Sequence, residues 1–245
     1  MRGASLENRI LPAPAHAYAP AAPLPRRPQA VIFDMDGTLL DTEAVHRVTM
    51  QAAADELGHH LPDALFLELV GVHRDANTVR LLEHFGADFP IDLFYGDSDA
   101  RFEAMWRAGV PLRPGARETL AWLAARALPM AIATSTLSPF AEDRLRHAGL
   151  LDFFAVVVTR SDVTRPKPDG QAFMLAAERL GLDPRDCIAV EDSPNGLRAA
   201  AAAGMMALLV PDLVPPSDDA ATLAHAILPD LAAVCALIDA APFAS

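Results

Sequence analysis

Residues 30–43 read AVIFDMDGTLLDTE, an apolar run followed at once by acids, glycine and threonine. The apolar run is short and rich in β-branched and aromatic residues, which favours a buried strand. Asp34 and Asp36 come directly after it, and a strand-like period of two directs both carboxylates to the same side. Gly37 allows a sharp turn, and Thr38 adds a hydroxyl and an amide beside the acids. This arrangement is typical of a site for a metal ion and a phosphate.

The rest of the chain alternates short apolar runs with stretches of helical periodicity. We expect strands at residues 30–33, 130–133, 155–158, 188–190 and 207–210. We expect helices between them at residues 117–126, 140–148, 171–180 and 194–203. Such alternation predicts the α/β class, with a doubly wound, Rossmann-like sheet that is mainly parallel. Ligands bind such sheets at the carboxyl ends of the strands.

One interval breaks this alternation and reads as helices only. The expected helices lie at residues 43–57, 63–70, 75–85 and 91–106, with glycines between them. We therefore expect a helical cap at residues 42–111, inserted into a core made of residues 29–41 and 112–245. The hinges would lie near residues 40–42 and 110–114. Residues 1–28 are rich in Ala and Pro and are expected to form a disordered tail.

Four motifs along the chain occur in a fixed order. They are DMDGTLLDTE at 34–43, IATS at 132–135, RPKPD at 165–169 and EDSPNG at 191–196. Together they resemble the haloacid dehalogenase superfamily, subfamily I with a helical cap, in its phosphatase and β-phosphoglucomutase-like branch. The resemblance implies a phosphomonoesterase that hydrolyses a small phosphorylated metabolite, with a sugar phosphate as the expected substrate class. It covers about residues 29–210.

The resemblance also implies roles for the acids of the first motif. Asp34 would be the nucleophile that forms an aspartyl phosphate. Asp36 would protonate the leaving alkoxide and then take a proton from the attacking water. Asp34, the backbone carbonyl of Asp36 and Asp192 would hold Mg²⁺, which suits a set of oxygen ligands. Glu191 would support this site from behind.

Further residues would bind the phosphate and the substrate. Thr134 and the amide of Ser135 would hold the transferring phosphoryl group. Lys167 would screen that group from the nucleophile. Thr38 would assist from behind the site, and the cap residues His46 and Arg74 would face the substrate.

Lys167 stands out from the composition alone. Lysine and arginine together number 20, and this residue is the only lysine in the sequence. Arginine is therefore used wherever a generic positive charge suffices. Lysine offers a compact ammonium with three rotatable donors, whereas arginine offers a flat fork. A compact cation suits a position that must contact both a phosphate oxygen and a carboxylate.

The composition indicates which binding partners are disfavoured and which cellular compartment is favoured. The formal net charge of -12 disfavours nucleic acid and anionic membranes as partners. No stretch reaches the roughly 18 uninterrupted apolar residues of a membrane span. Cys187 and Cys235 are the only two cysteines and form no zinc spacing or disulfide framework, which favours a reducing cytoplasm. We expect a cytoplasmic monomer or weak dimer.

Two other functions fit the same motifs. A phosphomutase of the β-phosphoglucomutase type shares the core but carries a cap lysine, which is absent here, although Arg101 or Arg107 could substitute. A non-catalytic phosphate-binding regulatory module would be expected to lose Asp34 or Asp36, and both are present. Hydrolysis is therefore the leading prediction.

Overall fold

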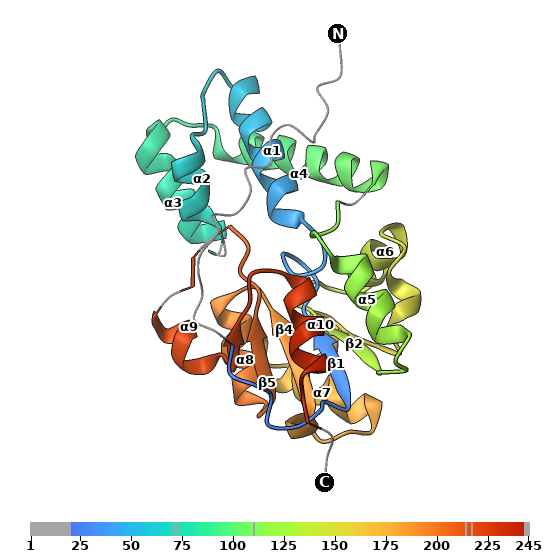
Figure 1. Cartoon of the computed structure of the whole chain (residues 1–245). Coiled ribbons are helices and arrows are strands. Elements are labelled where there is room, and N and C mark those ends of the chain that lie inside the picture. The colour runs from blue at the N-terminus through green and yellow to red at the C-terminus, as the bar shows by residue number, and fades with distance from the viewer. Residues whose placement is uncertain are drawn as a thin grey trace.

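The computed structural model describes residues 21–242, apart from 71, 73, 110, 214 and 217. Its centre is a parallel sheet of six strands in the order β3-β2-β1-β4-β5-β6 (Figure 1). The strands are β1 (Ala30–Phe33), β2 (Met130–Ala133), β3 (Val156–Val158), β4 (Cys187–Glu191), β5 (Met206–Leu209) and β6 (Ala226–Ile227). The predicted α/β class and parallel sheet are confirmed. The order reverses direction at β1, and ligands bind at such a point in doubly wound sheets.

Helices cover both faces of this sheet. One face carries α5 (Ala116–Ala124), α6 (Phe140–His147) and α10 (Leu231–Asp239). The other carries α7 (Gln171–Leu180), α8 (Pro194–Ala202) and α9 (Asp218–Leu223). Short 3₁₀ helices lie at Leu151–Phe153, Arg160–Asp162 and Pro184–Asp186. Alternate strand residues enter the two cores, as the period of two along a buried strand requires.

The strand predictions agree closely with the structure. The bounds of β1 and β2 match the prediction, and β3 begins one residue later than expected. The sixth strand, β6, was not predicted because its two residues, Ala226 and Ile227, are too few to show a pattern. It is recognised only by its pairing with Leu208 and Leu209.

Four helices precede α5 in the interval between β1 and β2. They are α1 (Thr42–Glu56), α2 (Asp63–Leu69), α3 (Arg74–Phe85) and α4 (Ile91–Ala108). They gather beyond the ends of β1 and β2, apart from the six helices on the sheet (Figure 1). Their own core includes Leu61, Phe66, Leu81 and Phe94. These four helices, called the cap below, occupy the interval in which a helical insertion was expected, and their role as a separate domain stays a prediction.

The chain passes between the sheet and these helices twice, at positions that lie side by side. The amide of Asp41 donates to the carbonyl of Pro111 at 2.9 Å, and the amide of Arg113 donates to the carbonyl of Leu39 at 2.9 Å. These bonds join the segments predicted as hinges, of which Val110 lies outside the described residues. Any movement of the cap must therefore involve both crossings together.

The N-terminal boundary of the core differs from the prediction. Residues 1–20 of the expected tail lie outside the described residues. Leu24 is only 2% exposed and belongs to the core beneath α5 and α10, while the amide of Arg27 donates to the carbonyl of Pro242 at 3.0 Å. Residues 24–28 are therefore part of the fold, because one apolar side chain within a Pro-rich segment finds a buried place. Within the described part of the chain, no helix is long and apolar enough to cross a membrane.

Candidate active site

The predicted motifs meet at the carboxyl end of the sheet. Asp34 follows β1, Thr134 follows β2 and Asp192 follows β4. Because β1 pairs in parallel with both β2 and β4, these three strand ends lie next to one another. Lys167 reaches the same place from the loop that precedes α7. Residues distant in the sequence thus form one site at the point where the strand order reverses.

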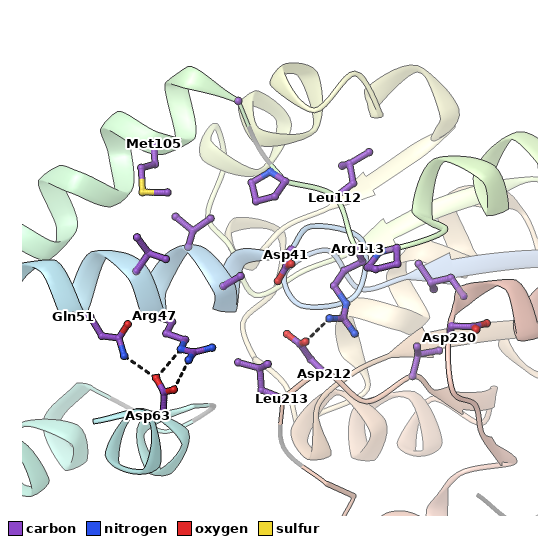
Figure 2. Close-up of a pocket in the computed structure, with 18 of the residues that line it drawn as sticks. Asp41, Arg47, Gln51, Asp63, Met105, Leu112, Arg113, Asp212, Leu213 and Asp230 are labelled. Atoms are coloured by element: carbon purple, nitrogen blue, oxygen red, sulfur yellow. Dashed lines mark hydrogen bonds and ion pairs between the residues drawn. The ribbon is translucent and has the colours of Figure 1, made fainter. Parts of the chain in front are cut away.

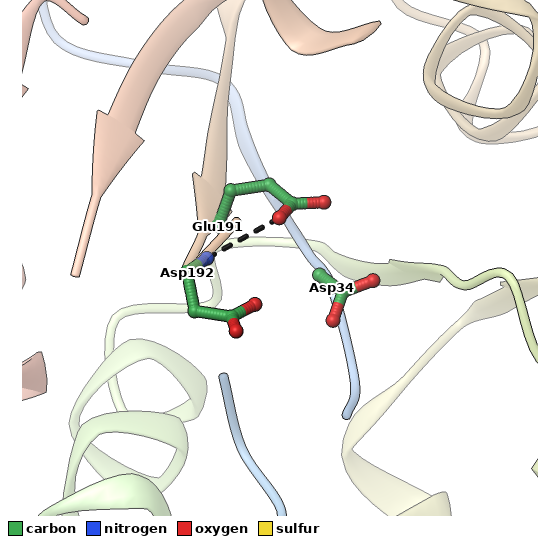
Figure 3. Close-up of side chains that lie close together, drawn as sticks. All are labelled: Asp34, Glu191 and Asp192. Atoms are coloured by element: carbon green, nitrogen blue, oxygen red, sulfur yellow. Dashed lines mark hydrogen bonds between the residues drawn. The ribbon is translucent and has the colours of Figure 1, made fainter. Parts of the chain in front are cut away.

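Three buried or half-buried carboxylates form its centre. Each of Asp34, Glu191 and Asp192 offers one oxygen, and these oxygens lie within 4.8 Å of one another. Figure 3 shows the side chains converging from the ends of β1 and β4. Like charges this close require a cation or protons between them.

Lys167 supplies one such cation. Its Nζ donates to Asp34 Oδ1 at 2.6 Å and to Glu191 Oε1 at 2.5 Å, and the lysine side chain is 6% exposed. Burial lowers the pKa of Lys167, but the two carboxylates outweigh it and leave the pKa above its ordinary value. Burial raises the pKa of Asp34, with Glu191 and Asp36 adding to this and Lys167 opposing it. The lysine is therefore held charged between two acids.

Asp192 is placed by the turn of the first motif. Thr38 Oγ1 donates to Asp192 Oδ1 at 3.0 Å. Gly37 has a φ of +83°, and a Cβ at this position would lie 2.3 Å from Asp192 Oδ2. Glycine is thus required both by the backbone conformation and by the close carboxylate. Burial, with Glu191 and Asp34, raises the pKa of Asp192 well above its ordinary value.

Glu191 is held from behind by the start of α8. Its Oε2 accepts from Ser193 Oγ at 3.0 Å and from the amide of Asp192 at 3.2 Å. Ser193 also caps the helix, accepting from the amide of Gly196 at 3.1 Å. A Cβ on Gly196 would lie 1.8 Å from Glu191 Oε1. The fourth motif therefore packs its helix directly against its own acid.

We expect Gly196→Ala to destabilise the protein by about 1–3 kcal/mol, the usual cost of overpacking a buried position. The added methyl must displace either Glu191 or the start of α8. The free energy of unfolding, measured by urea titration, checks this. Gly96→Ala is the matched control, because Gly96 lies in α4 with nothing within 4 Å of an added Cβ, and it should be neutral or stabilising. Equal stability of the two variants would contradict the prediction.

Asp36 has two partners that the sequence did not reveal. Its Oδ2 accepts from Thr136 Oγ1 at 2.6 Å, and its Oδ1 accepts from Arg144 Nη1 at 3.0 Å. Thr136 is the residue directly after the second motif, so extending that motif by one residue would have included it. Arg144 lies in α6, where it reads as an ordinary helical arginine, and no sequence signal singles it out.

The two residues predicted to bind phosphate from the second motif differ in exposure. Thr134 is 2% exposed, and its Oγ1 accepts from the amide of Thr136 at 3.1 Å. Ser135 is exposed. The hydroxyl of Thr134 thus shapes the loop and keeps its own proton available for donation to an anion.

The cap places His46 near this site. Its ring stacks on Phe102 with centroids 4.2 Å apart. Burial lowers the pKa of His46, whereas the nearby carboxylate of Asp36 opposes this and the nearby Arg144 adds to it. His46 therefore lies close to Asp36, and its contact with a substrate stays a prediction.

Arg74 has a strong partner within the cap. Its Nη2 lies 2.7 Å from Asp99 Oδ1, and its guanidinium lies 4.4 Å from the centroid of the Tyr95 ring. The side chain is half-exposed. Two residues of the sequence motif around it, Gly71 and His73, lie outside the described residues. Its contact with a substrate stays a prediction.

A separate cavity of about 1090 Å³ lies between α1, the second hinge and the start of α10. Its lining includes the ion pairs of Arg47 with Asp63 and of Arg113 with Asp212 (Figure 2). Asp34, Asp36, Lys167 and Asp192 do not line it. Of the four motifs, only the first reaches this cavity, through Asp41, so the cavity is distinct from the cluster of acids around Lys167.

Comparison with known proteins shows the family to which this chain is similar. Residues 28–204 match the family model described as haloacid dehalogenase-like hydrolase. The plasmid-encoded protein CbbY of Cupriavidus necator is 36% identical over 201 residues, 75% of this chain and 78% of that protein. Fructose-1-phosphate phosphatase YqaB of Escherichia coli is 33% identical over 178 residues, 73% of this chain and 94% of that protein.

A solved structure shows the same architecture. The crystal structure of a putative β-phosphoglucomutase from Thermotoga maritima superposes with a TM-score of 0.74 at 27% identity, covering 86% of this chain and 98% of that one. The family match spans all four motifs gathered at the sheet edge. The chain therefore belongs to the haloacid dehalogenase-like hydrolases, on the branch that holds phosphatases and β-phosphoglucomutase-like proteins.

Proposed function

We propose that this protein is a Mg²⁺-dependent phosphatase that hydrolyses a small sugar phosphate through an aspartyl phosphate on Asp34. One observation carries the proposal: Asp34 lies with Lys167 and Asp192 at the reversal point of the sheet, in a family of hydrolases. Named phosphatases of phosphorylated sugars among its relatives support the choice of substrate class.

The charges at the site fit a divalent cation. Asp34, Glu191 and Asp192 are neutralised by Lys167 only in part, which leaves two uncompensated negative charges when all three acids are ionised. Oxygen ligands favour Mg²⁺. Asp34, Asp192 and the backbone carbonyl of Asp36 would hold the ion, which when bound would neutralise charge on the phosphoryl oxygens.

The reaction would proceed in two displacements. In the first, a carboxylate oxygen of Asp34 forms a bond to phosphorus while the bond from phosphorus to the ester oxygen breaks. Asp36 gives its proton to the departing alkoxide. In the second, Asp36 takes a proton from water, the water oxygen bonds to phosphorus, and Asp34 leaves as a carboxylate. The products are an alcohol and inorganic phosphate.

The remaining residues would hold the phosphoryl group and the substrate. Lys167 stays charged beside Asp34 and would place its ammonium against the phosphoryl oxygens. The hydroxyl of Thr134 and the amide of Ser135 would donate to the same group. His46 and Arg74 would contact the part of the substrate away from the reacting phosphorus.

Hydrolysis can be separated from phosphomutase activity by one assay. The only lysine of this chain lies in the core, so no cap lysine is available to hold a second phosphate. We therefore expect water, rather than a sugar hydroxyl, to accept the phosphoryl group. The enzyme is incubated with a hexose 1-phosphate and a trace of hexose 1,6-bisphosphate, with Mg²⁺ or with chelator. Release of inorganic phosphate that requires Mg²⁺ is the expected result, and rapid formation of hexose 6-phosphate with little free phosphate would contradict it.

A further inference from the structure

Arg144 links the core to the cap at the proposed general acid. It lies in α6 of the core, and its Nη1 donates to Asp36 Oδ1 at 3.0 Å. The same guanidinium lies 4.8 Å from the ring centroid of Trp106 and 5.6 Å from that of Phe102, both in α4 of the cap. One side chain thus contacts an acid of the first motif and two cap aromatics.

The position of the Asp36 carboxylate depends on this contact. One oxygen accepts from Arg144 and the other from Thr136. The Asp36 side chain is 27% exposed, so surrounding packing alone does not confine it. Without the guanidinium, one of the two bonds that orient the carboxylate is lost, and rotation about its side-chain torsions becomes easier.

The aromatic contact gives the guanidinium a second, independent anchor. Trp106 and Phe102 are 5% and 6% exposed, and their rings stack with centroids 5.8 Å apart. Phe102 in turn stacks on His46 of α1. Cation–π contacts and partly exposed ion pairs are of comparable strength, so neither anchor dominates the other. A shift of α4 therefore changes where Arg144 can place its nitrogens.

We propose that Arg144 is a positioning residue for Asp36, and that its packing on Trp106 and Phe102 makes the orientation of this acid depend on the position of the cap. The proposal rests on the proposed phosphatase function, in which Asp36 delivers the proton to the leaving alkoxide. Arg144 itself acts through Asp36 and needs no contact with the substrate.

The test compares two leaving groups. An alkoxide needs a proton as it departs, whereas nitrophenolate leaves as a stable anion. Fructose 1-phosphate and para-nitrophenyl phosphate are hydrolysed by wild type, Asp36→Asn, Arg144→Met and Arg144→Lys. The measured quantity is the ratio of kcat/KM for the alkyl ester to kcat/KM for the aryl ester. A general loss of folding lowers both values equally and leaves this ratio unchanged.

Arg144→Met should lower the ratio about tenfold or more, a part of the full contribution that a general acid makes. Asp36→Asn should lower it furthest, and Arg144→Lys should restore part of it. Arg146→Met is the matched control, because Arg146 lies two residues further along α6, is 59% exposed and pairs with Asp143. It should leave the ratio as in wild type. Arg144→Gln replaces Arg144→Met if the latter does not fold.

The connection to the cap is tested by a double-mutant cycle. Trp106→Leu should lower the same ratio, and it should have no further effect when Arg144 is already Met. Independent, multiplying effects of the two substitutions would overturn the connection to the cap. An unchanged ratio in Arg144→Met would overturn the role of Arg144 while leaving the phosphatase intact. Failure of wild type to release phosphate from either ester would overturn the phosphatase function itself, and this inference with it.

Discussion

Asp34→Asn is expected to abolish turnover, with a loss on the order of 10⁴-fold or more, as when a covalent nucleophile is removed. The amide is nearly isosteric with the carboxyl group, and its oxygen can still accept from Lys167, which now lies 2.6 Å from Asp34 Oδ1. It is a poor nucleophile, however, and a weaker metal ligand. The measurement is phosphate release under saturating substrate and Mg²⁺.

The fold should survive this substitution. Burial raises the pKa of Asp34, which means that the ionised carboxyl group is disfavoured in the folded, metal-free protein. The stability associated with such a group is present at low pH and is lost as pH rises through its folded-state pKa. Because an amide does not ionise, Asp34→Asn does not lose stability in this way as the pH rises. The melting temperature of Asp34→Asn in chelator at neutral pH should therefore equal or exceed that of wild type.

Asp152→Asn serves as the matched control, since Asp152 is exposed in the short helix before β3. It should retain wild-type activity. Hydrolysis near the wild-type rate in Asp34→Asn would rule out the aspartyl phosphate. A folded but inactive variant would also exclude a purely regulatory, non-catalytic role, provided that wild type turns over.

Lys167→Arg is expected to lower kcat by about 10²-fold or more, the scale of a misplaced electrostatic contact in a catalytic site. The charge is unchanged, so the effect measures shape. The ammonium lies between Asp34 and Glu191 at 2.6 and 2.5 Å and is 4.8 Å from the centroid of the Phe173 ring. A guanidinium is larger and planar, and it cannot donate in both directions from one compact centre.

The control is the converse exchange in the same loop. Arg165 is 61% exposed and pairs with Asp169, so Arg165→Lys should leave kcat and KM nearly unchanged. Wild-type kinetics in Lys167→Arg would show that the site needs only a positive charge. Such kinetics would also show that the use of lysine at this one position, in a chain that otherwise uses arginine, has no functional reason.

Much of this site could be predicted from the sequence because its reactive residues lie in short sequence motifs. The strand before Asp34 places that acid, and the turn at Gly37 follows directly, so both depend on the eight consecutive residues 30–37. The strand-end rule then brings Asp192 and Thr134 to the same edge without knowledge of any contact. Parallel pairing of β1 with β2 and β4 satisfies that rule.

The partners of Asp36 could not be read in this way. Arg144 lies 108 residues further along the chain, and its role depends on which face of α6 meets the first motif. Helical periodicity marks that residue only as polar. Arg74 is the reverse case, because the sequence motif around it predicted a functional role but not its partner. Its ion pair with Asp99 depends on how α3 packs against α4.

The sequence by itself therefore determined the class of fold, the edge of the sheet that holds the site and the residue types that gather there. Local periodicity and turn chemistry are sufficient for these, because each acts over a few neighbouring residues. Only the tertiary structure decided that Leu24 belongs to the core, that β6 closes one edge of the sheet, and that Arg144 joins Asp36 to the aromatic side chains of α4. Each of these depends on contacts between distant segments, and such contacts exist only once the helices have packed on the sheet.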